Sequence, residues 1–183
     1  LREEISQSLA ALEKELGKEF GGVANPLLVS VRSGAKFSMP GMMETVLNVG
    51  MSQEVATTLE KMTGDSRFAW DSYRRFIEMF GKTVCDIPSE AFAKVAAPLI
   101  AAAGGKTIAD LDGPALRKAG DAFVGVVEKH TGTPFPFDAR SQLIRAIEAV
   151  FHSWNSERAQ LYRRRERISA DLGTAVNVQA MVF

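Results

Sequence analysis

The feature that most constrains the fold is a block of purely helical periodicity from residue 52 to about residue 131. Within it, apolar residues recur at steps of three and four, as on the buried face of an amphipathic helix. Four such stripes follow one another, at 55–62, 69–80, 92–100 and 116–127. The block therefore predicts four consecutive helices.

The interruptions between these stripes are short and contain glycine, proline or aspartate, which is typical of helix ends. They fall at 63–65, Gly81, 86–88, 104–105 and 113–114. The last of them places a proline at the first helical position, where its missing N–H costs nothing. Because short connections favour antiparallel neighbours, we expect these helices to form a bundle.

Strand patterns flank the helical block on both sides. Residues 27–31 are apolar and β-branched after an Asn-Pro turn, 45–51 is interpreted as a second strand, and 174–182 alternates into a third. Helical stripes also cover 5–16, and two further helices are expected between 138 and 168, the second of them basic. The chain thus combines a few strands with many helices.

The clearest candidate boundary is 131–137, where two prolines and a glycine separate the helical block from the last part of the chain. We therefore expect an α+β fold in three parts. Residues 1–52 form the first part of a subdomain, 53–137 form an inserted all-helical bundle, and 138–183 complete the subdomain.

Composition limits the class of protein. With 183 residues, 46% apolar and 24% charged, the chain is expected to be globular. Lys plus Arg equals Asp plus Glu at 22 each, a balance that gives no support for nucleic-acid or anionic-membrane binding. No apolar run approaches the roughly 20 residues needed to span a bilayer.

The reactive residues are few. The single cysteine, Cys85, excludes an internal disulfide and suits a reducing compartment, so a cytoplasmic location is the default expectation. Two histidines, His130 and His152, are too few for a His-rich metal site. The chain begins without Met and stops in a strand-like run, so we expect it to be an internal piece of a longer protein.

The segment 29–48, VSVRSGAKFSMPGMMETVLN, is the strongest candidate site. A strand that leads into Gly- and Ser-rich chain exposes backbone N–H groups that can hold a phosphate, and a guanidinium can add paired hydrogen bonds. Arg32 and Lys36 fit that design. Neither a Walker motif nor GxGxxG is present. From spacing alone, an ordinary strand-to-loop connection with a solvated arginine remains an open alternative.

The stretch VRSGAKFSMPGMMETVLNVG at 31–50 closely resembles the glycine-rich loop of the nucleotide-binding domain of the pyruvate, phosphate dikinase family. Three further segments, at 66–81, 142–159 and 173–183, resemble the same domain in the same order. The related phosphoenolpyruvate synthases lack Ser-Met-Pro-Gly-Met-Met after their Arg-Ser. The resemblance covers essentially the whole chain.

The resemblance implies an incomplete ATP-grasp-like subdomain, in which ATP lies between two lobes and a mobile loop, here 32–45, closes over its phosphates. It implies phosphoryl transfer from ATP and inorganic phosphate to a histidine on another domain of the same full-length chain, for the interconversion of pyruvate and phosphoenolpyruvate. It also implies Mg²⁺, with ligands outside this segment, and a homo-oligomeric full-length enzyme. We expect the chain alone to be inactive.

The resemblance also assigns the candidate site residues. Arg32 is the expected catalytic residue, since its rigid guanidinium fork suits transferring phosphate oxygens better than lysine does. Residues expected to contact the nucleotide are Ser33, Gly34, Lys36, Ser38, Gly41, Met42, Gln179, Met181 and Val182. No metal ligand is assigned.

Several of these residues have structural alternatives that the sequence leaves open. Met39, Met42 and Met43 suit a loop that repacks on closing, or simply pack around Pro40. Glu44 could cap a helix or take part in catalysis. The last three assigned residues, at 179–182, could equally be buried in the sheet.

Other conspicuous residues are expected to be structural. The basic run 163–167 is interpreted as a solvated or salt-bridged helix face. The two histidines are expected at the surface or in capping positions, and Cys85 is expected to be inert. Trp70 and Trp154 are expected to lie in the core or at a contact between subdomains. A non-catalytic helical protein-interaction module is the alternative function.

Overall fold

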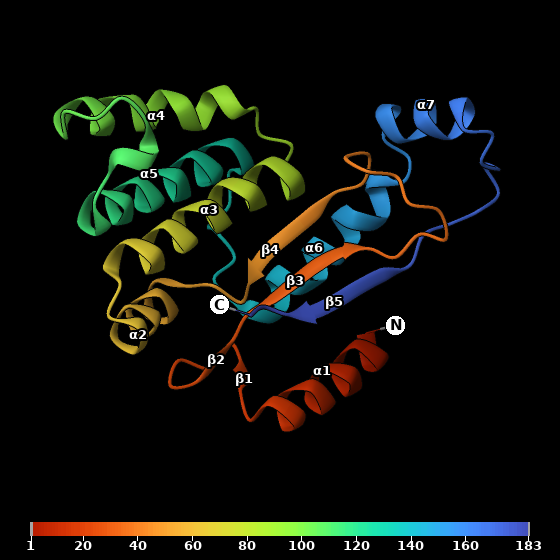
Figure 1. The fold of residues 1–183 in the computed structure, drawn as a ribbon, viewed down its shortest axis with the longest axis horizontal. Coiled ribbons are helices and arrows are strands. Elements are labelled where there is room, and N and C mark those ends of the chain that lie inside the picture. The colour runs from red at the N-terminus through yellow and green to blue at the C-terminus, as the bar shows by residue number, and fades with distance from the viewer. Residues whose placement is uncertain (1, 183) are drawn as a thin grey trace.

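The protein is described here by a computed structural model covering residues 2–182 (Figure 1). The first helix, α1, is followed by four strands that lead into the helical block. Their bounds are α1 (Arg2–Leu16), β1 (Glu19–Phe20), β2 (Pro26–Leu27), β3 (Val29–Ser33) and β4 (Thr45–Val49).

The helical block and the last part of the chain complete the fold. The block contains α2 (Gln53–Thr63), α3 (Ser66–Val84), α4 (Ser89–Ala102), a 3-10 turn η1 (Ile108–Asp110) and α5 (Gly113–Thr131). The remainder contains α6 (Ala139–Ser153), α7 (Glu157–Arg165) and β5 (Val176–Ala180). The expected α+β class and the four helices of the block are confirmed.

A three-stranded antiparallel sheet forms the centre of the fold, with strand order β4-β3-β5. Arg32 of β3 is paired with Thr45 of β4 and with Asn177 of β5. Within residues 2–182, β5 pairs with β3 alone, so its second edge has no neighbouring strand. β1 and β2 form a separate short parallel pair.

The sheet has one covered and one open face. Val29, Val31 and Val46 are fully buried, and α6 packs against the sheet behind β3 (Figure 1). Because side chains alternate along a strand, Arg32 and its partner Asn177 lie together on one face, where both are exposed. The sheet therefore presents polar groups on the face that α6 does not cover.

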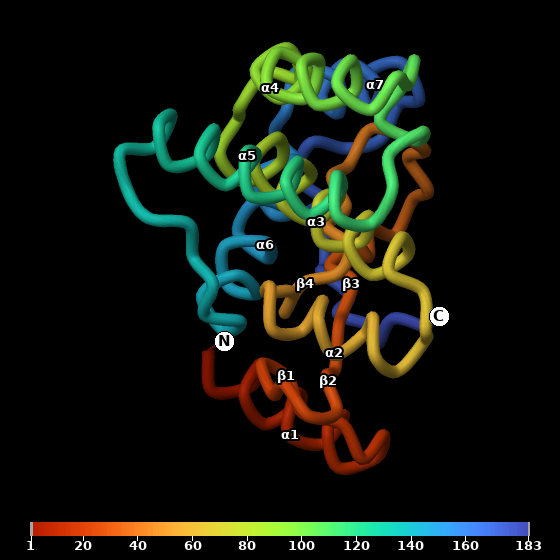
Figure 2. The backbone as a smooth tube through the Cα atoms, turned by 90° about the vertical axis from the view of Figure 1, so that its left-hand side faces the viewer, coloured from red at the N-terminus to blue at the C-terminus, as the bar shows by residue number. Residues whose placement is uncertain are grey.

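The helical block shares one core with the sheet. α3 packs against α2 and α5, α4 packs on α5, and α3 also contacts β4 and α6. The buried apolar residues of all these elements belong to a single cluster. In Figures 1 and 2, α4 and α1 lie at opposite ends of the molecule. The boundaries 1–52, 53–137 and 138–183 stay predictions.

The predicted helix break at Gly81 is wrong, because α3 continues through it to Val84. A Cβ at this position would lie 2.5 Å from Cζ of Phe92 and 3.0 Å from Cγ2 of Val127. The glycine thus makes room for a buried phenylalanine of α4. That packing offsets the roughly 1 kcal/mol that a glycine costs inside a helix.

The remaining differences concern element ends and one arginine. The first sheet strand is β3 rather than 27–31, since 26–27 pairs with β1 instead. The basic helix ends at Arg165. Within it, Arg163 is buried, contrary to the expected solvated face. Its guanidinium lies 4.0 Å from the Trp154 ring and donates to the Trp154 carbonyl oxygen.

Two glycines of α5 allow a matched test of the contact between α3 and α5. A Cβ at Gly120 would lie 2.5 Å from two atoms of the buried Tyr73 ring, whereas one at Gly125 would meet no atom within 4 Å. We expect Gly120→Ala to lower the free energy of unfolding by about 2 kcal/mol through overpacking.

The control, Gly125→Ala, should raise the free energy of unfolding by up to about 1 kcal/mol, because alanine is the better helix former. Urea unfolding of the two variants and the parent checks both signs. Equal effects of the two substitutions would contradict the close approach of α3 and α5 at Gly120.

Candidate functional site

The loop between β3 and β4 encloses a hollow at the end of the sheet. It is lined by residues 32–41, 43–45 and Asn177, and its volume is about 610 Å³. The end of β3, the loop, the start of β4 and the adjacent strand β5 all contribute to the lining. The size lies within the range of small-molecule sites in proteins.

Arg32 provides the main positive charge of the hollow. It is the last exposed residue on the polar face of β3, directly opposite Asn177. Among residues 2–182, no carboxylate lies within ion-pair distance of its guanidinium. An exposed charged group without a counter-ion among the described residues is available to an anionic ligand.

Two glycines shape the backbone of the loop. The Gly34 N–H donates to the Ala175 carbonyl oxygen at 2.7 Å, and a Cβ on Gly34 would lie 3.0 Å from Nδ2 of Asn177. Gly41 has φ of +70°, a conformation that favours glycine. The first glycine holds the loop close to β5, and the second turns it back toward β4.

The tip of the loop is open to solvent. Lys36, Phe37 and Ser38 are exposed, and the Lys36 ammonium lies 5.9 Å from the Phe37 ring centre. Met39 is the exception, since only 7% of it is exposed. At least one of the loop methionines therefore packs inside, which was one of the two interpretations of the sequence.

The second end of the loop is held by three helices. The Glu44 N–H donates to Ser153 Oγ at the end of α6 (3.1 Å). The Glu44 carboxylate accepts from Thr83 Oγ1 of α3 (3.3 Å) and forms an ion pair with Arg158 of α7. Arg158 Nε also donates to the Met42 carbonyl oxygen (3.3 Å). The sequence did not indicate the contacts of Arg158, Ser153 or Thr83.

The hollow brings together six of the assigned residues: Arg32, Ser33, Gly34, Lys36, Ser38 and Gly41. The side chain of Met42 lies outside the lining. Gln179 is exposed on β5, two positions beyond Asn177 and on the same face. Met181 and Val182 line a different, largely apolar hollow with Leu28. Asn177, which the sequence analysis missed, could have been found from Gln179 by the two-residue period of a strand.

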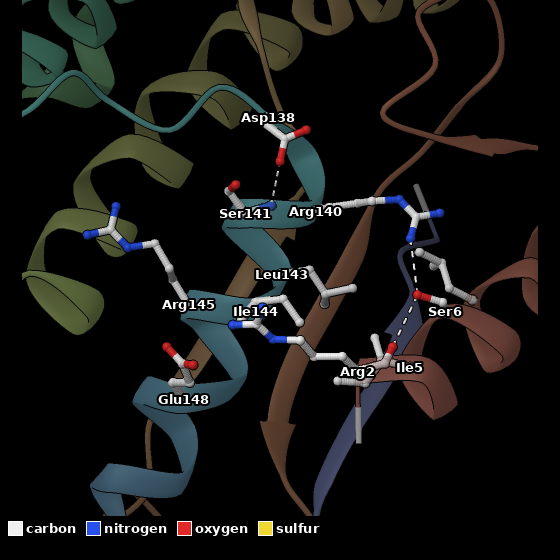
Figure 3. Close-up of a pocket in the computed structure, with 11 residues that line it drawn as sticks. Arg2, Ile5, Ser6, Asp138, Arg140, Ser141, Leu143, Ile144, Arg145 and Glu148 are labelled. Atoms are coloured by element: carbon white, nitrogen blue, oxygen red, sulfur yellow. Dashed lines mark hydrogen bonds between the residues drawn. The ribbon is translucent and has the colours of Figure 1, made fainter.

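A third hollow, of about 400 Å³, lies between α1 and the first part of α6 (Figure 3). Arg140 donates to Ser6 across it, and Asp138 caps α6 by accepting from the Ser141 N–H. The hydrogen bonds from Ser141 lower the pKa of Asp138. The lining of this hollow shares no residue with the lining of the hollow at Arg32, so the two are separate.

Three further sequence expectations concern the histidines, the tryptophans and the single cysteine. His130 and His152 are both exposed, and Trp70 and Trp154 are buried. Cys85 is half-buried, and burial raises the pKa of its thiol. Its thiolate is therefore less available near neutral pH than that of an exposed cysteine.

Residues 2–182 contain neither a metal cluster nor a membrane-spanning helix. In this part of the chain, no three His, Cys, Asp or Glu side chains are placed to hold a metal ion. None of the helices in the same range has the length and apolar character to cross a bilayer.

Comparison with known proteins decides the family. The family described as pyruvate phosphate dikinase, AMP/ATP-binding domain, matches residues 1–183. The chain belongs to this family. The resemblance seen at 31–50 and in the three later segments is thereby confirmed.

Several curated relatives in the pyruvate, phosphate dikinase family match the chain along its whole length. They include pyruvate, phosphate dikinase of Giardia intestinalis (45% identical) and of Clostridium symbiosum (44%), in each of which the match covers 21% of the relative. Pyruvate, phosphate dikinase 1, chloroplastic, of Oryza sativa subsp. japonica is 47% identical, with 19% of the relative covered. The chain thus spans about a fifth of the length of these dikinases.

Proposed function

We propose that the hollow at Arg32 binds the phosphate groups of ATP, as part of the nucleotide-binding region of a pyruvate, phosphate dikinase. The observation that carries this proposal is the exposed Arg32 guanidinium, without a carboxylate partner among residues 2–182, in one hollow with Lys36 and the Gly34 and Gly41 backbone. Membership of an AMP/ATP-binding domain family supports the same ligand.

The residues of the hollow fit a phosphate chain chemically. Arg32 donates a pair of parallel hydrogen bonds to phosphate oxygens, which also neutralises their charge. Lys36 adds a second cation from the flexible tip, and Ser38 adds a hydroxyl donor. Phosphoryl transfer requires positioning and charge neutralisation more than covalent assistance. Arg32 is therefore the residue with the greatest effect on the transfer step.

The adenine end of the nucleotide is assigned to the other end of β5. Gln179 lies on the same sheet face as Arg32 and Asn177, and the chain continues to Met181 and Val182, which line an apolar hollow of about 310 Å³. An apolar hollow suits a purine ring, and the exposed amide of Gln179 can form hydrogen bonds with its edge. These three residues thus extend the proposed site along the sheet.

The rest of the reaction belongs to the full-length protein. ATP supplies the phosphoryl group, inorganic phosphate is the second substrate, and a histidine on another domain of the same chain is the acceptor. The family resemblance implies that the Mg²⁺ ligands lie outside this segment, so they are proposed to come from another part of the full-length protein. A cytoplasmic, homo-oligomeric enzyme that interconverts pyruvate and phosphoenolpyruvate completes the proposal.

Titration of ATP and Mg²⁺ into the full-length protein tests this function. Saturable binding is expected, and Lys36→Ala should weaken it by several-fold by removing one cation from the hollow. Lys118→Ala, an exposed lysine of α5, is the matched control and should leave the affinity unchanged. A non-catalytic helical interaction module predicts no saturable binding at all, and that result would overturn the proposal.

A further inference from the structure

We propose that Arg158 and Glu44 form a clamp that fixes the second end of the loop between β3 and β4. This contact makes Arg158 a positioning residue for the nucleotide site. The inference rests on the proposed function for the identity of the ligand. The clamp itself is a feature of the chain and can be measured without nucleotide.

Three helices meet at Glu44. Its N–H donates to Ser153 Oγ, and Ser153 Oγ in turn donates to the Val150 carbonyl oxygen at 2.7 Å, which ties the loop to the last turn of α6. One carboxylate oxygen of Glu44 accepts from Thr83 of α3, and the other pairs with Arg158 of α7. A single loop residue thus connects elements that lie 39, 109 and 114 positions away along the chain.

Arg158 contacts the loop at two points. Its Nη2 pairs with the Glu44 carboxylate, and its Nε donates to the Met42 carbonyl oxygen. Lysine cannot reproduce this arrangement, because its three N–H donors share one nitrogen, whereas Nε and Nη2 of the guanidinium are held apart in a rigid plane. Arg158 does not line the hollow at Arg32, so any effect on a ligand there acts through the loop.

The exposed tip contrasts with this fixed end. The tip between Lys36 and Gly41 is joined to the fixed end by a backbone hydrogen bond from Met42 N–H to the Met39 carbonyl oxygen, at 3.1 Å. Lys36 and Phe37 are exposed and adjacent. The position of the tip relative to Arg32 therefore depends on how firmly the two ends of the loop are held.

The pair is half-exposed, with 50% of the Arg158 side chain and 32% of the Glu44 side chain accessible. Exposed ion pairs contribute little to the stability of a fold. The free energy of this pair acts instead on one end of a loop whose tip is exposed. Loss of the clamp should therefore change loop mobility and leave global stability almost unchanged.

Limited trypsin digestion of the full-length protein without nucleotide tests the clamp. Cleavage between Lys36 and Phe37, followed by mass spectrometry of the fragments, reports on mobility of the loop tip. We expect Arg158→Ala to speed this cleavage by about fivefold, the equivalent of a surface pair of about 1 kcal/mol. Arg164→Ala, an exposed arginine on the same helix, should cleave like the parent.

A double-mutant cycle shows whether the two residues act as a unit. Glu44→Ala and Arg158→Ala should each accelerate cleavage, and the double variant should be accelerated by less than the product of the two single effects, because the shared ion pair is lost only once. Arg158→Lys should fall between parent and alanine. The proposal would be overturned if the acceleration in the double variant equalled the product of the two single accelerations. It would also be overturned if Arg158→Ala were cleaved at the parent rate.

The same variants separate this inference from the proposed function. If the clamp positions the loop for phosphate, Arg158→Ala should also weaken ATP binding by about fivefold, with the same non-additivity toward Glu44→Ala. Faster cleavage with unchanged ATP affinity would remove the positioning role. A parent protein that binds no ATP would instead contradict the proposed function, while the cleavage result would still stand.

Discussion

Replacing Arg32 with alanine in the full-length enzyme is expected to slow phosphorylation of the enzyme by ATP by about 100-fold or more. The estimate follows the usual effect of removing one charge-stabilising donor from a transfer site. Arg32 is exposed in the hollow without a carboxylate partner in residues 2–182, so its loss removes the strongest cation there without leaving a buried charge unpaired.

The partial reactions distinguish this role from a general defect. Under the proposed function, phosphorylation of pyruvate by enzyme that already carries a phosphoryl group bypasses the hollow at Arg32, so it should proceed at the parent rate. Arg32→Lys should lie between parent and alanine, because it keeps the charge and loses the paired donors. Rapid-quench measurement of the ATP step gives the comparison.

A matched control uses a charge of the same kind away from the hollow. The Arg165 side chain on α7 is 84% exposed, and Arg165→Ala should leave the ATP step unchanged. An unchanged ATP step in Arg32→Ala would refute the role given to Arg32. Loss of both partial reactions in that variant would point to misfolding instead, which circular dichroism would reveal.

Replacing Gln142 with methionine should lower the free energy of unfolding by about 3 kcal/mol. Gln142 is fully buried and joins α6 to the end of β4. Its Oε1 accepts from the Gly50 N–H at 2.8 Å, and its Nε2 donates to the Met51 carbonyl oxygen at 3.0 Å. Methionine has a similar length and leaves both backbone groups without partners, at roughly 1–3 kcal/mol each.

The control for this substitution is Gln160→Met on α7. Gln160 also makes a side-chain bond to a carbonyl oxygen, that of Asn155 at 2.7 Å, but it is exposed, so water can replace the bond. We expect a change within about 0.5 kcal/mol. Urea unfolding measures both. Similar losses for the two variants would contradict the role of burial in the stability of this contact.

The local pattern of apolar and capping residues in the sequence was sufficient to predict most of the helices and strands. The spacing of apolar residues indicated the helices of 52–131, and α6 and α7 begin after Asp138 and Ser156, residue types that are typical of helix N-caps. The predicted break at Gly81 was wrong because helix propensity is a property of the single residue and takes no account of its tertiary contacts. The contact of Gly81 with Phe92 is a tertiary one that no local rule contains.

The residues of the candidate site divide in the same way, into those that a local motif indicates and those that only tertiary contacts bring to the loop. Arg32, Lys36 and the glycines follow one another in the chain, so a short motif was enough to select them. Asn177 and Arg158 reach the loop only through strand pairing and helix packing, across more than 100 residues of sequence. Asn177 was missed because the motif at 173–183 does not show which of its residues faces Arg32.

The bare side of β5 has a practical consequence for work with these 183 residues alone. Among residues 2–182, its outward N–H and C=O groups have no strand beside them, and Val176, Val178 and Ala180 are only half-covered. An unpaired strand edge of this kind readily forms backbone hydrogen bonds with a strand of another molecule. Dimers or aggregates of this piece in solution would then reflect the exposed strand edge, so quaternary structure is best determined on the intact enzyme.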